Sequence, residues 1–280
     1  EERGVTVLRE EFEAKMEEQK EKARSAREVV MEKGQDSFIE EFYDKYGVTK
    51  FTGYEKTKDE GKLLSIREAK DGKYLLIFDK TPFYAESGGQ VGDQGRIYSD
   101  NFEAKVLDVQ KQKDIFIHTV EFKKGMAEEN KTYKLEVDIV KRLDTAKNHT
   151  ATHLLHKALR EVVGTHVQQA GSLVDSEKLR FDFSHYEAVT VEQLSKIEDI
   201  VNEKIREGIE VAVSHHTIEE AKKLGAMMLF GDKYGDVVRV VDVPGFSTEL
   251  CGGTHIDNIG KIGLFKIVSE GGIAAGVRRI

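Results

Sequence analysis

The chain has 280 residues, which is enough for one large or two modest domains with a buried hydrophobic core. It carries 43 Lys and Arg against 51 Asp and Glu, a net charge of −8, and 39% of its residues are hydrophobic, as is typical of globular proteins. No apolar run approaches the roughly 20 residues that a membrane span needs. The single cysteine excludes a disulfide framework and fits a reducing compartment, as in the cytoplasm.

Residues 1–47 are expected to form a helical linker. Apolar and small side chains recur there at helical spacing, at Phe12, Met16, Gln19, Ala23, Ala26 and Val30. Gly34 is the expected end of this helix, which we interpret as a solvated connector. Because the chain lacks an initiator Met and ends in the strand-like run 276–280, we expect it to be excised from a longer protein.

Residues 48–140 are predicted to form a small β-barrel-like subdomain. Strand patterns occur at residues 74–78, 102–109, 115–120 and 132–140. Turn signals at residues 70–72, 99–101 and 124–125 separate them. Closely spaced short strands of this kind indicate a small barrel or sandwich.

Residues 141–280 mix helices and strands. Helices are predicted at residues 142–163, ended by Gly164, and at 190–206, with a third, shorter one beginning at Thr217. Thr190 and Thr217 each begin a capping-box pattern. Strands are predicted at residues 178–183, 210–213, 236–243 and 263–268. The whole chain is therefore expected to be α+β with antiparallel sheet, and not a doubly wound α/β protein.

The chain lacks the sequence patterns of a P-loop, a dinucleotide-binding glycine motif, a nucleophile elbow and a His-Glu-x-x-His metalloprotease helix. It therefore gives no sign that it uses ATP or a nicotinamide cofactor.

Two short motifs predict a metal centre. His149 and His153 are four residues apart on a predicted helix, so both imidazoles can reach one ion. Cys251 and His255 flank two glycines, and this spacing predicts a tight loop that turns both side chains toward one point. One thiolate with imidazoles is a zinc-type ligand set. His156 lies on the same helical stripe, but we interpret it as a packed or exposed histidine.

The sequence is compatible with either four or three protein ligands to the zinc. Four protein ligands would close a structural zinc site, whereas His149, His153 and Cys251, with His255 weakly bound or outside the ligand set, would leave a position for water or substrate.

Two further segments are candidates for ligand binding. Gly88, Gly89 and Gln90 follow a predicted strand and could offer backbone N–H groups and a side-chain amide, although an ordinary hairpin loop has the same composition. Arg278 and Arg279 end a stretch from residue 260 that is locally basic, and they could contact phosphates or simply end a solvated strand.

These blocks, in this order, resemble the editing region of alanyl-tRNA synthetases. The matching segments are residues 81–84, 87–93, 148–155, 164–172, 180–183, 250–255 and 273–280. Residues 12–19 resemble the helix that leads into that region. The resemblance covers nearly the whole chain. Threonyl-tRNA synthetases and free-standing editing proteins share the two-part metal motif, but the Thr81-Pro-Phe-Tyr block favours the alanyl family.

The resemblance implies a zinc-containing editing subdomain at residues 141–280 that hydrolyses Ser-tRNA(Ala) and Gly-tRNA(Ala) at the acceptor end. The family's metal ligands fall on His149, His153, Cys251 and His255, and Gln169 falls in its substrate pocket. Thr81 best matches a threonine that senses the serine hydroxyl. The remaining domains of a full-length synthetase are the expected partners, and no membrane is. A non-catalytic tRNA-binding module with a structural zinc, and a zinc hydrolase of small molecules, are the alternatives.

Overall fold

The structure, a computed structural model, describes Lys15 and residues 35–228 and 235–280. The helix predicted before Gly34 lies outside the described residues apart from Lys15.

The chain divides into two units, Glu1–Val48 and Thr49–Ile280. In the first unit, helix α2 spans Gln35–Tyr46, and the rings of Phe42 and Tyr46 lie one turn apart with centroids separated by 4.9 Å. Gly47, with a φ of 73°, terminates this helix in the left-handed conformation that favours glycine.

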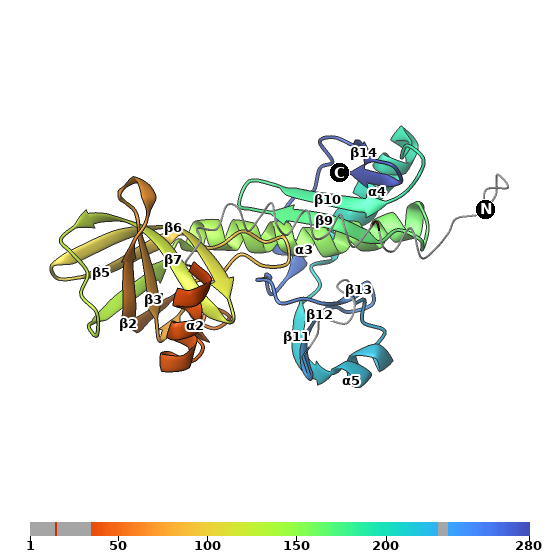
Figure 1. Ribbon diagram of the computed structural model, residues 1–280. Coiled ribbons are helices and arrows are strands. Elements are labelled where there is room, and N and C mark those ends of the chain that lie inside the picture. Colours follow the sequence, from red (N-terminus) through yellow and green to blue (C-terminus); the bar gives the residue numbers. More distant parts are fainter. Residues whose placement is uncertain (1–14, 16–34, 229–234) are drawn as a thin grey trace. The chain divides into compact units, whose positions relative to one another are not determined.

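The second unit begins with a closed barrel (Figure 1) in which all neighbouring strands are antiparallel. The order around the barrel is β2-β3-β7-β6-β5-β8. These strands are β2 (Lys58–Glu68), β3 (Tyr74–Phe78), β5 (Gly95–Ser99), β6 (Phe102–Gln112), β7 (Ile115–Lys124) and β8 (Thr132–Val137). A short parallel pair, β1 (Lys50–Phe51) and β4 (Lys80–Thr81), accompanies the barrel. The predicted barrel is confirmed.

Side chains alternate between the barrel core and solvent. On β8, Tyr133, Leu135 and Val137 are buried, whereas the alternate residues Thr132 and Lys134 are exposed. The sequence did not reveal β2, because this strand turns a glycine, a leucine and a serine inward and therefore lacks the usual apolar alternation.

The barrel passes directly into α3 (Ile139–Val162), the longest of the described helices. Strand β8 ends at Val137 and α3 begins two residues later, so Asp138 alone joins them. The Asp138 carboxylate caps the helix by accepting a hydrogen bond from the Lys141 N–H at 3.2 Å.

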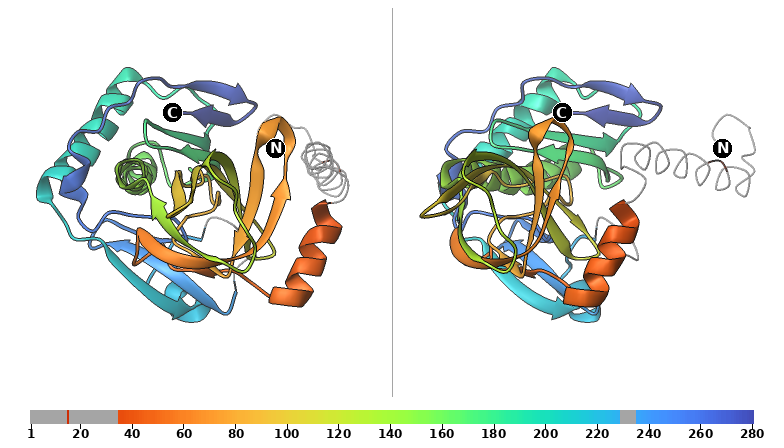
Figure 2. Two further views of the ribbon diagram at one scale, coloured as in Figure 1. Left: turned by 90° about the vertical axis from the view of Figure 1, so that its left-hand side faces the viewer. Right: turned by 60° about the vertical axis from the view of Figure 1, so that its left-hand side comes forward.

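Two antiparallel sheets lie on opposite sides of α3 (Figures 1 and 2). One has the order β14-β15-β10-β9 and the other β11-β12-β13. Their strands are β9 (Gln169–Val174), β10 (Leu179–Ser184), β11 (Ala212–Thr217), β12 (Val237–Val243), β13 (Ser247–Leu250), β14 (Gly271–Ala274) and β15 (Val277–Arg279). With the barrel, these antiparallel sheets confirm the α+β class.

Helix α4 (Val191–Glu207) packs on α3 and completes the core beneath the first sheet. Leu154, Phe181 and Val201 are each completely buried in this core. Thr190 forms the predicted capping box at the start of α4, and Gly208 ends it with a φ of 62°. Thr217 caps the short helix α5 (Ile218–Lys223) in the same way.

The predicted strand at residues 263–268 is wrong. A 3₁₀ turn at Ile259–Ile262 is followed there by irregular chain. Side chains of α4 satisfy its backbone: Asn202 accepts from the Phe265 N–H at 2.9 Å, and Glu198 accepts from the Ile267 N–H at 2.6 Å. Because these polar groups are already paired, the segment needs no neighbouring strand.

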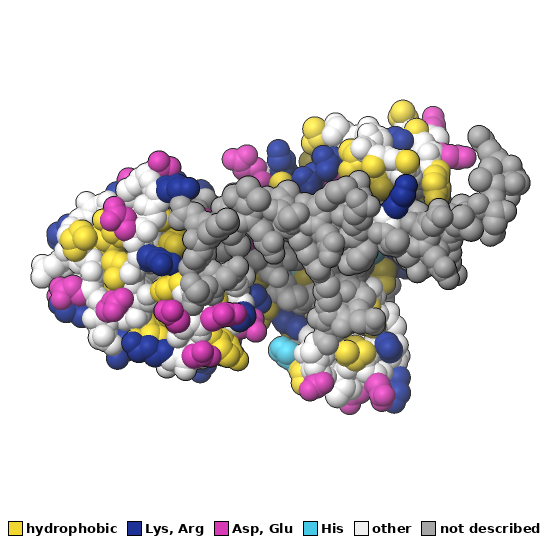
Figure 3. All heavy atoms as spheres, viewed as in Figure 1, with side chains coloured by type: hydrophobic (Ala, Val, Ile, Leu, Met, Phe, Trp, Pro, Cys, Tyr) yellow, Lys and Arg dark blue, Asp and Glu magenta, His cyan; other side chains and the backbone are white. Residues whose placement is uncertain are grey.

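None of the described helices combines the length and the apolar character required to cross a membrane. Over the face of the barrel in Figure 3, basic and acidic side chains are interspersed.

Candidate metal centre

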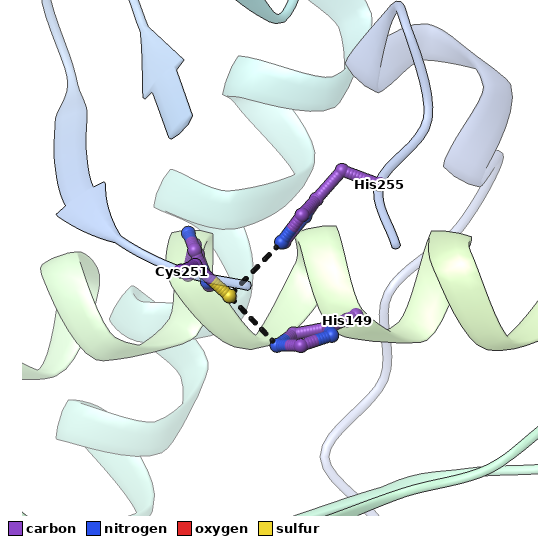
Figure 4. Close-up of side chains that lie close together, drawn as sticks. His149, Cys251 and His255 are labelled. Carbon is purple, nitrogen blue, oxygen red and sulfur yellow. Dashed lines mark hydrogen bonds between the residues drawn. The ribbon is translucent and has the colours of Figure 1, made fainter. Parts of the chain in front are cut away.

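Four side chains converge from two segments of the chain. His149 and His153 lie one turn apart on α3, and Cys251 and His255 belong to the loop that follows β13. One ligand atom from each lies within 4.8 Å of all the others. In Figure 4 the Nε2 atoms of His149 and His255 point at Cys251 Sγ, at 3.4 and 3.3 Å.

These distances fit a tetrahedral zinc site. With Zn–S of about 2.3 Å and Zn–N of about 2.0 Å, sulfur and nitrogen ligands of one ion lie roughly 3.5 Å apart. The donor set of one thiolate and three imidazoles suits Zn²⁺ better than Mg²⁺ or Ca²⁺, which prefer oxygen ligands. The residues present therefore fit the predicted metal.

The charges of the cluster also suit a cation. Burial opposes ionisation of the Cys251 thiol, but His149 and His255 beside it hold its pKa well below the usual value. Burial lowers the pKa of His255 to about 3. For His153, burial acts in the same direction, but the Glu249 carboxylate and the Cys251 sulfur raise the pKa to about 9. At neutral pH a metal would therefore displace a proton from His153.

Several groups hold the Cys251–His255 loop in place. The Arg239 guanidinium donates to the carbonyl oxygens of Cys251 and Gly253 at 2.8 and 2.9 Å. The Tyr54 hydroxyl, from the barrel side, donates to Gly252 O at 2.6 Å.

The two glycines of this loop, Gly252 and Gly253, do not have positive φ angles. Gly253 is instead required by close approach, because a Cβ there would lie 2.0 Å from His149 Cε1.

The cluster forms part of the wall of a cavity of about 600 Å³. His149, His153 and Cys251 line this cavity, as do Gly88 and Gln169. His255 is not among the described residues that line it. Gly89 lies behind Gly88, with a φ of 89°, and a Cβ there would lie 2.8 Å from Ser172.

Two other predicted site residues have different surroundings from those expected. Gln90 is completely buried, and its amide contacts His149 and Thr254. Thr81 is also completely buried, in β4, where its hydroxyl lies 2.8 Å from His118 Nε2 in the barrel core. Neither Gln90 nor Thr81 is among the described residues that line the cavity.

The two predicted phosphate ligands are engaged in ion pairs. Arg279 donates from Nε and Nη2 to the Asp182 carboxylate at 2.7 and 2.9 Å. Arg278 binds Glu270 in the same bidentate way. Both arginines belong to β15, which lies between β14 and β10 in its sheet.

Sequence reasoning missed Glu249, which is 1% exposed and lines the cavity two residues before Cys251. Its Oε1 lies 3.3 Å from His156 Nδ1, and its Oε2 lies 4.0 Å from His153 Nε2. Burial acts to raise the pKa of Glu249, but His153 and His156 lower it below its usual value. His156 is thus a packed histidine, as interpreted. The sequence signal that could have revealed Glu249 is its position two residues before Cys251, since carboxylates next to metal ligands often orient them.

Profiles of two protein families match the chain. The family described as "tRNA synthetases class II (A)" matches residues 1–141, and "Threonyl and Alanyl tRNA synthetase second additional domain" matches residues 238–280. An alanine–tRNA ligase of Fusobacterium nucleatum is 92% identical over 280 residues, which cover the whole of this chain and 32% of that relative. The chain belongs to the alanyl-tRNA synthetase family.

Other members of the alanyl-tRNA synthetase family are also similar along the whole chain. The alanine–tRNA ligase of Alkaliphilus metalliredigens is 48% identical over 289 residues, and that of Listeria innocua is 50% identical over 290 residues. The chain covers 33% of each of these two relatives, so it spans about a third of the length of the curated relatives it matches. The second family profile includes Cys251 and His255.

Proposed function

We propose that this chain hydrolyses the ester bond of mischarged Ser-tRNA(Ala) and Gly-tRNA(Ala), as the zinc-dependent editing region of an alanyl-tRNA synthetase. The observation that carries the proposal is the convergence of one thiolate and three imidazoles on the wall of a cavity of about 600 Å³. An aminoacylation site shaped for alanine cannot exclude the smaller glycine by size and rejects serine only modestly, so a second, hydrolytic site is needed.

His149, His153, Cys251 and His255 would hold the zinc ion. When bound, zinc supplies Lewis-acid polarisation of a water or an ester carbonyl. Gln169 faces the same cavity, and its amide can orient the oxygen atoms of the ester. Backbone N–H groups next to Gly88 and Gly89 can hold the aminoacyl end in the cavity.

Arg278 and Arg279 are proposed contacts for acceptor-stem phosphates. In each ion pair the guanidinium uses Nε and one terminal nitrogen, so further N–H donors stay available for a phosphate. Thr81 has no part in this proposal because its hydroxyl is buried in the barrel.

The partners would be the acceptor end of tRNA(Ala) and the remaining domains of a full-length synthetase. We place this activity in the cytoplasm, where reducing conditions keep the single cysteine free as a ligand.

A non-catalytic tRNA-binding module with a structural zinc is the second candidate. The observation in its favour is the number of ligands, because four protein ligands close a tetrahedral zinc to water and substrate. The position of His255 outside the cavity lining favours the catalytic reading, since its three partners face the cavity.

The deciding experiment measures deacylation of Ser-tRNA(Ala), Gly-tRNA(Ala) and Ala-tRNA(Ala) by the zinc-loaded protein, with and without a chelator. We expect hydrolysis of the first two esters, sparing the third, and loss of activity with the chelator. No hydrolysis in the presence of bound zinc, repeated in a full-length synthetase, would establish the structural-zinc candidate.

Two variants separate binding of zinc from the chemistry. Cys251→Ala should lower both zinc content and hydrolysis, and unchanged turnover would refute a catalytic metal centre. Gln169→Ala should lower turnover by about 100-fold with zinc retained, since it removes one positioned polar group. The neighbouring Gln168 is exposed, so Gln168→Ala is the matched control and should leave turnover unchanged.

A further inference from the structure

The side chain of Gln90 is completely buried at the place where a barrel loop meets the predicted metal ligands. The backbone around it is firmly held. The Val91 N–H donates to Val174 O at 3.1 Å, and the Val174 N–H donates to Gly89 O at 2.8 Å. The loop is therefore hydrogen-bonded to β9, and the backbone from which the Gln90 side chain extends is held in position.

The hydrogen bonds of this amide fix which end is oxygen. The Thr254 backbone N–H, which can only donate, lies 2.9 Å from Oε1. The Nε2 group then donates to Thr254 Oγ1 at 2.9 Å. His149 Nδ1 lies 2.8 Å from the same Oε1. Since this oxygen is an acceptor, His149 must carry its proton on Nδ1.

In the neutral imidazole this assignment puts the lone pair of His149 on Nε2, the atom that points at Cys251 Sγ. Thr150 fixes the Nδ1 atom of His255 as a donor in the same way. The Thr150 hydroxyl donates to Ala146 O at 2.9 Å, so it accepts from His255 Nδ1 at 3.0 Å. Both neutral imidazoles are thus held as the tautomer whose lone pair faces the cluster, which is the tautomer that binds a metal through Nε2.

We propose that Gln90 is a positioning residue of the metal centre. It orients His149, fixes its tautomer, and ties the Cys251–His255 loop to the barrel through Thr254. This role differs from the substrate contact that the sequence led us to expect, and it rests on the metal centre of the proposed function.

Cobalt binding tests this role directly, because Co²⁺ in a tetrahedral site has visible absorption bands that report ligand geometry. Gln90→Met keeps the length of the side chain and removes both polar ends. It should weaken Co²⁺ and Zn²⁺ binding by about 10- to 100-fold and alter the bands. Gln90→Glu retains the acceptor for His149 and Thr254 N–H, and should restore affinity to within about threefold of the wild type.

The matched control is Gln94→Met, because Gln94 is in the same stretch and its amide oxygen accepts a hydrogen bond from the exposed Lys141 at 2.6 Å. This variant should bind cobalt like the wild type. Unchanged cobalt affinity in Gln90→Met, with a raised KM for Ser-tRNA(Ala), would overturn the proposal in favour of a substrate contact.

A measurement on the unaltered protein does not depend on how the variants fold. Long-range ¹H–¹⁵N spectra of the zinc-loaded protein should show the His149 proton on Nδ1, and a proton on Nε2 would overturn the proposal. If these signatures are found in a protein that hydrolyses no ester, the proposed function fails while the positioning role stands.

Discussion

Replacing Arg142 by methionine is expected to lower the free energy of unfolding by about 3–5 kcal/mol. Arg142 lies in the first turns of α3, and only 6% of its side chain is exposed. Its guanidinium pairs with Asp93 from the barrel, whose side chain is also 6% exposed. It further donates to Gly53 O at 2.7 Å and to Pro82 O at 2.8 Å.

The magnitude follows from what the substitution leaves behind. Methionine fills much of the same volume and suits a helix, so packing and helix propensity change little. The Asp93 carboxylate loses its buried counterion, and two carbonyl oxygens lose their donors. An uncompensated buried charge is the largest of these costs and accounts for the 3–5 kcal/mol range.

Equilibrium urea unfolding followed by circular dichroism measures the change. Arg96→Met is the matched control, because Arg96 pairs with Glu136 at 2.8 Å but has 51% of its side chain exposed. That control should cost no more than about 1 kcal/mol. In the double variant Arg142→Met/Asp93→Asn, the cost should be smaller than the sum of the single costs, since no buried charge is left unpaired. Equal costs for Arg142→Met and Arg96→Met would refute the reasoning.

Two more predictions concern the barrel core and the metal loop. Burial lowers the pKa of His118 to about 4, so the unfolded chain, with a pKa near 6.5, takes up this proton first as the pH falls. Stability should therefore drop by about 3 kcal/mol between pH 6.5 and 4, and urea unfolding of His118→Gln should show a shallower loss; parallel curves would contradict this. Gly253→Ala should abolish tight zinc binding because the added Cβ would lie 2.0 Å from the His149 ring, whereas Gly252→Ala, whose Cβ has Tyr54 Oη at 3.8 Å as its nearest neighbour, should retain it. Zinc content after gel filtration distinguishes the two, and equal losses would contradict the close-approach argument.

The sequence predicted helices better than strands. Caps such as Thr190 and Thr217 are local chemistry, so α4 and α5 begin where their capping boxes indicated. Strands depend on partners elsewhere in the chain. Residues 263–268 have a strand-like composition, but α4 side chains bind their backbone, and no local pattern reveals that competition.

The convergence of the four His and Cys side chains was predictable for a similar reason. Each half is a short motif whose own geometry turns two side chains the same way, and the fold only had to bring α3 to the loop after β13. Gln90 and Thr81 could not be assigned in this manner. Their surroundings are set by contacts with His149 and His118, and the sequence separation of 59 and 37 residues carries no signal of either contact.

The single-residue joint at Asp138 has a mechanical consequence. A hinge needs a few residues that are free to change φ and ψ. Asp138 is held by its helix cap and by donating its own N–H to Gln94 O at 2.8 Å, and the Arg142 ion pair lies one turn further on. These contacts therefore oppose a hinge motion of the barrel about the start of α3. A ligand must therefore enter the cavity past side chains and loops, while the joint between the barrel and α3 stays in place.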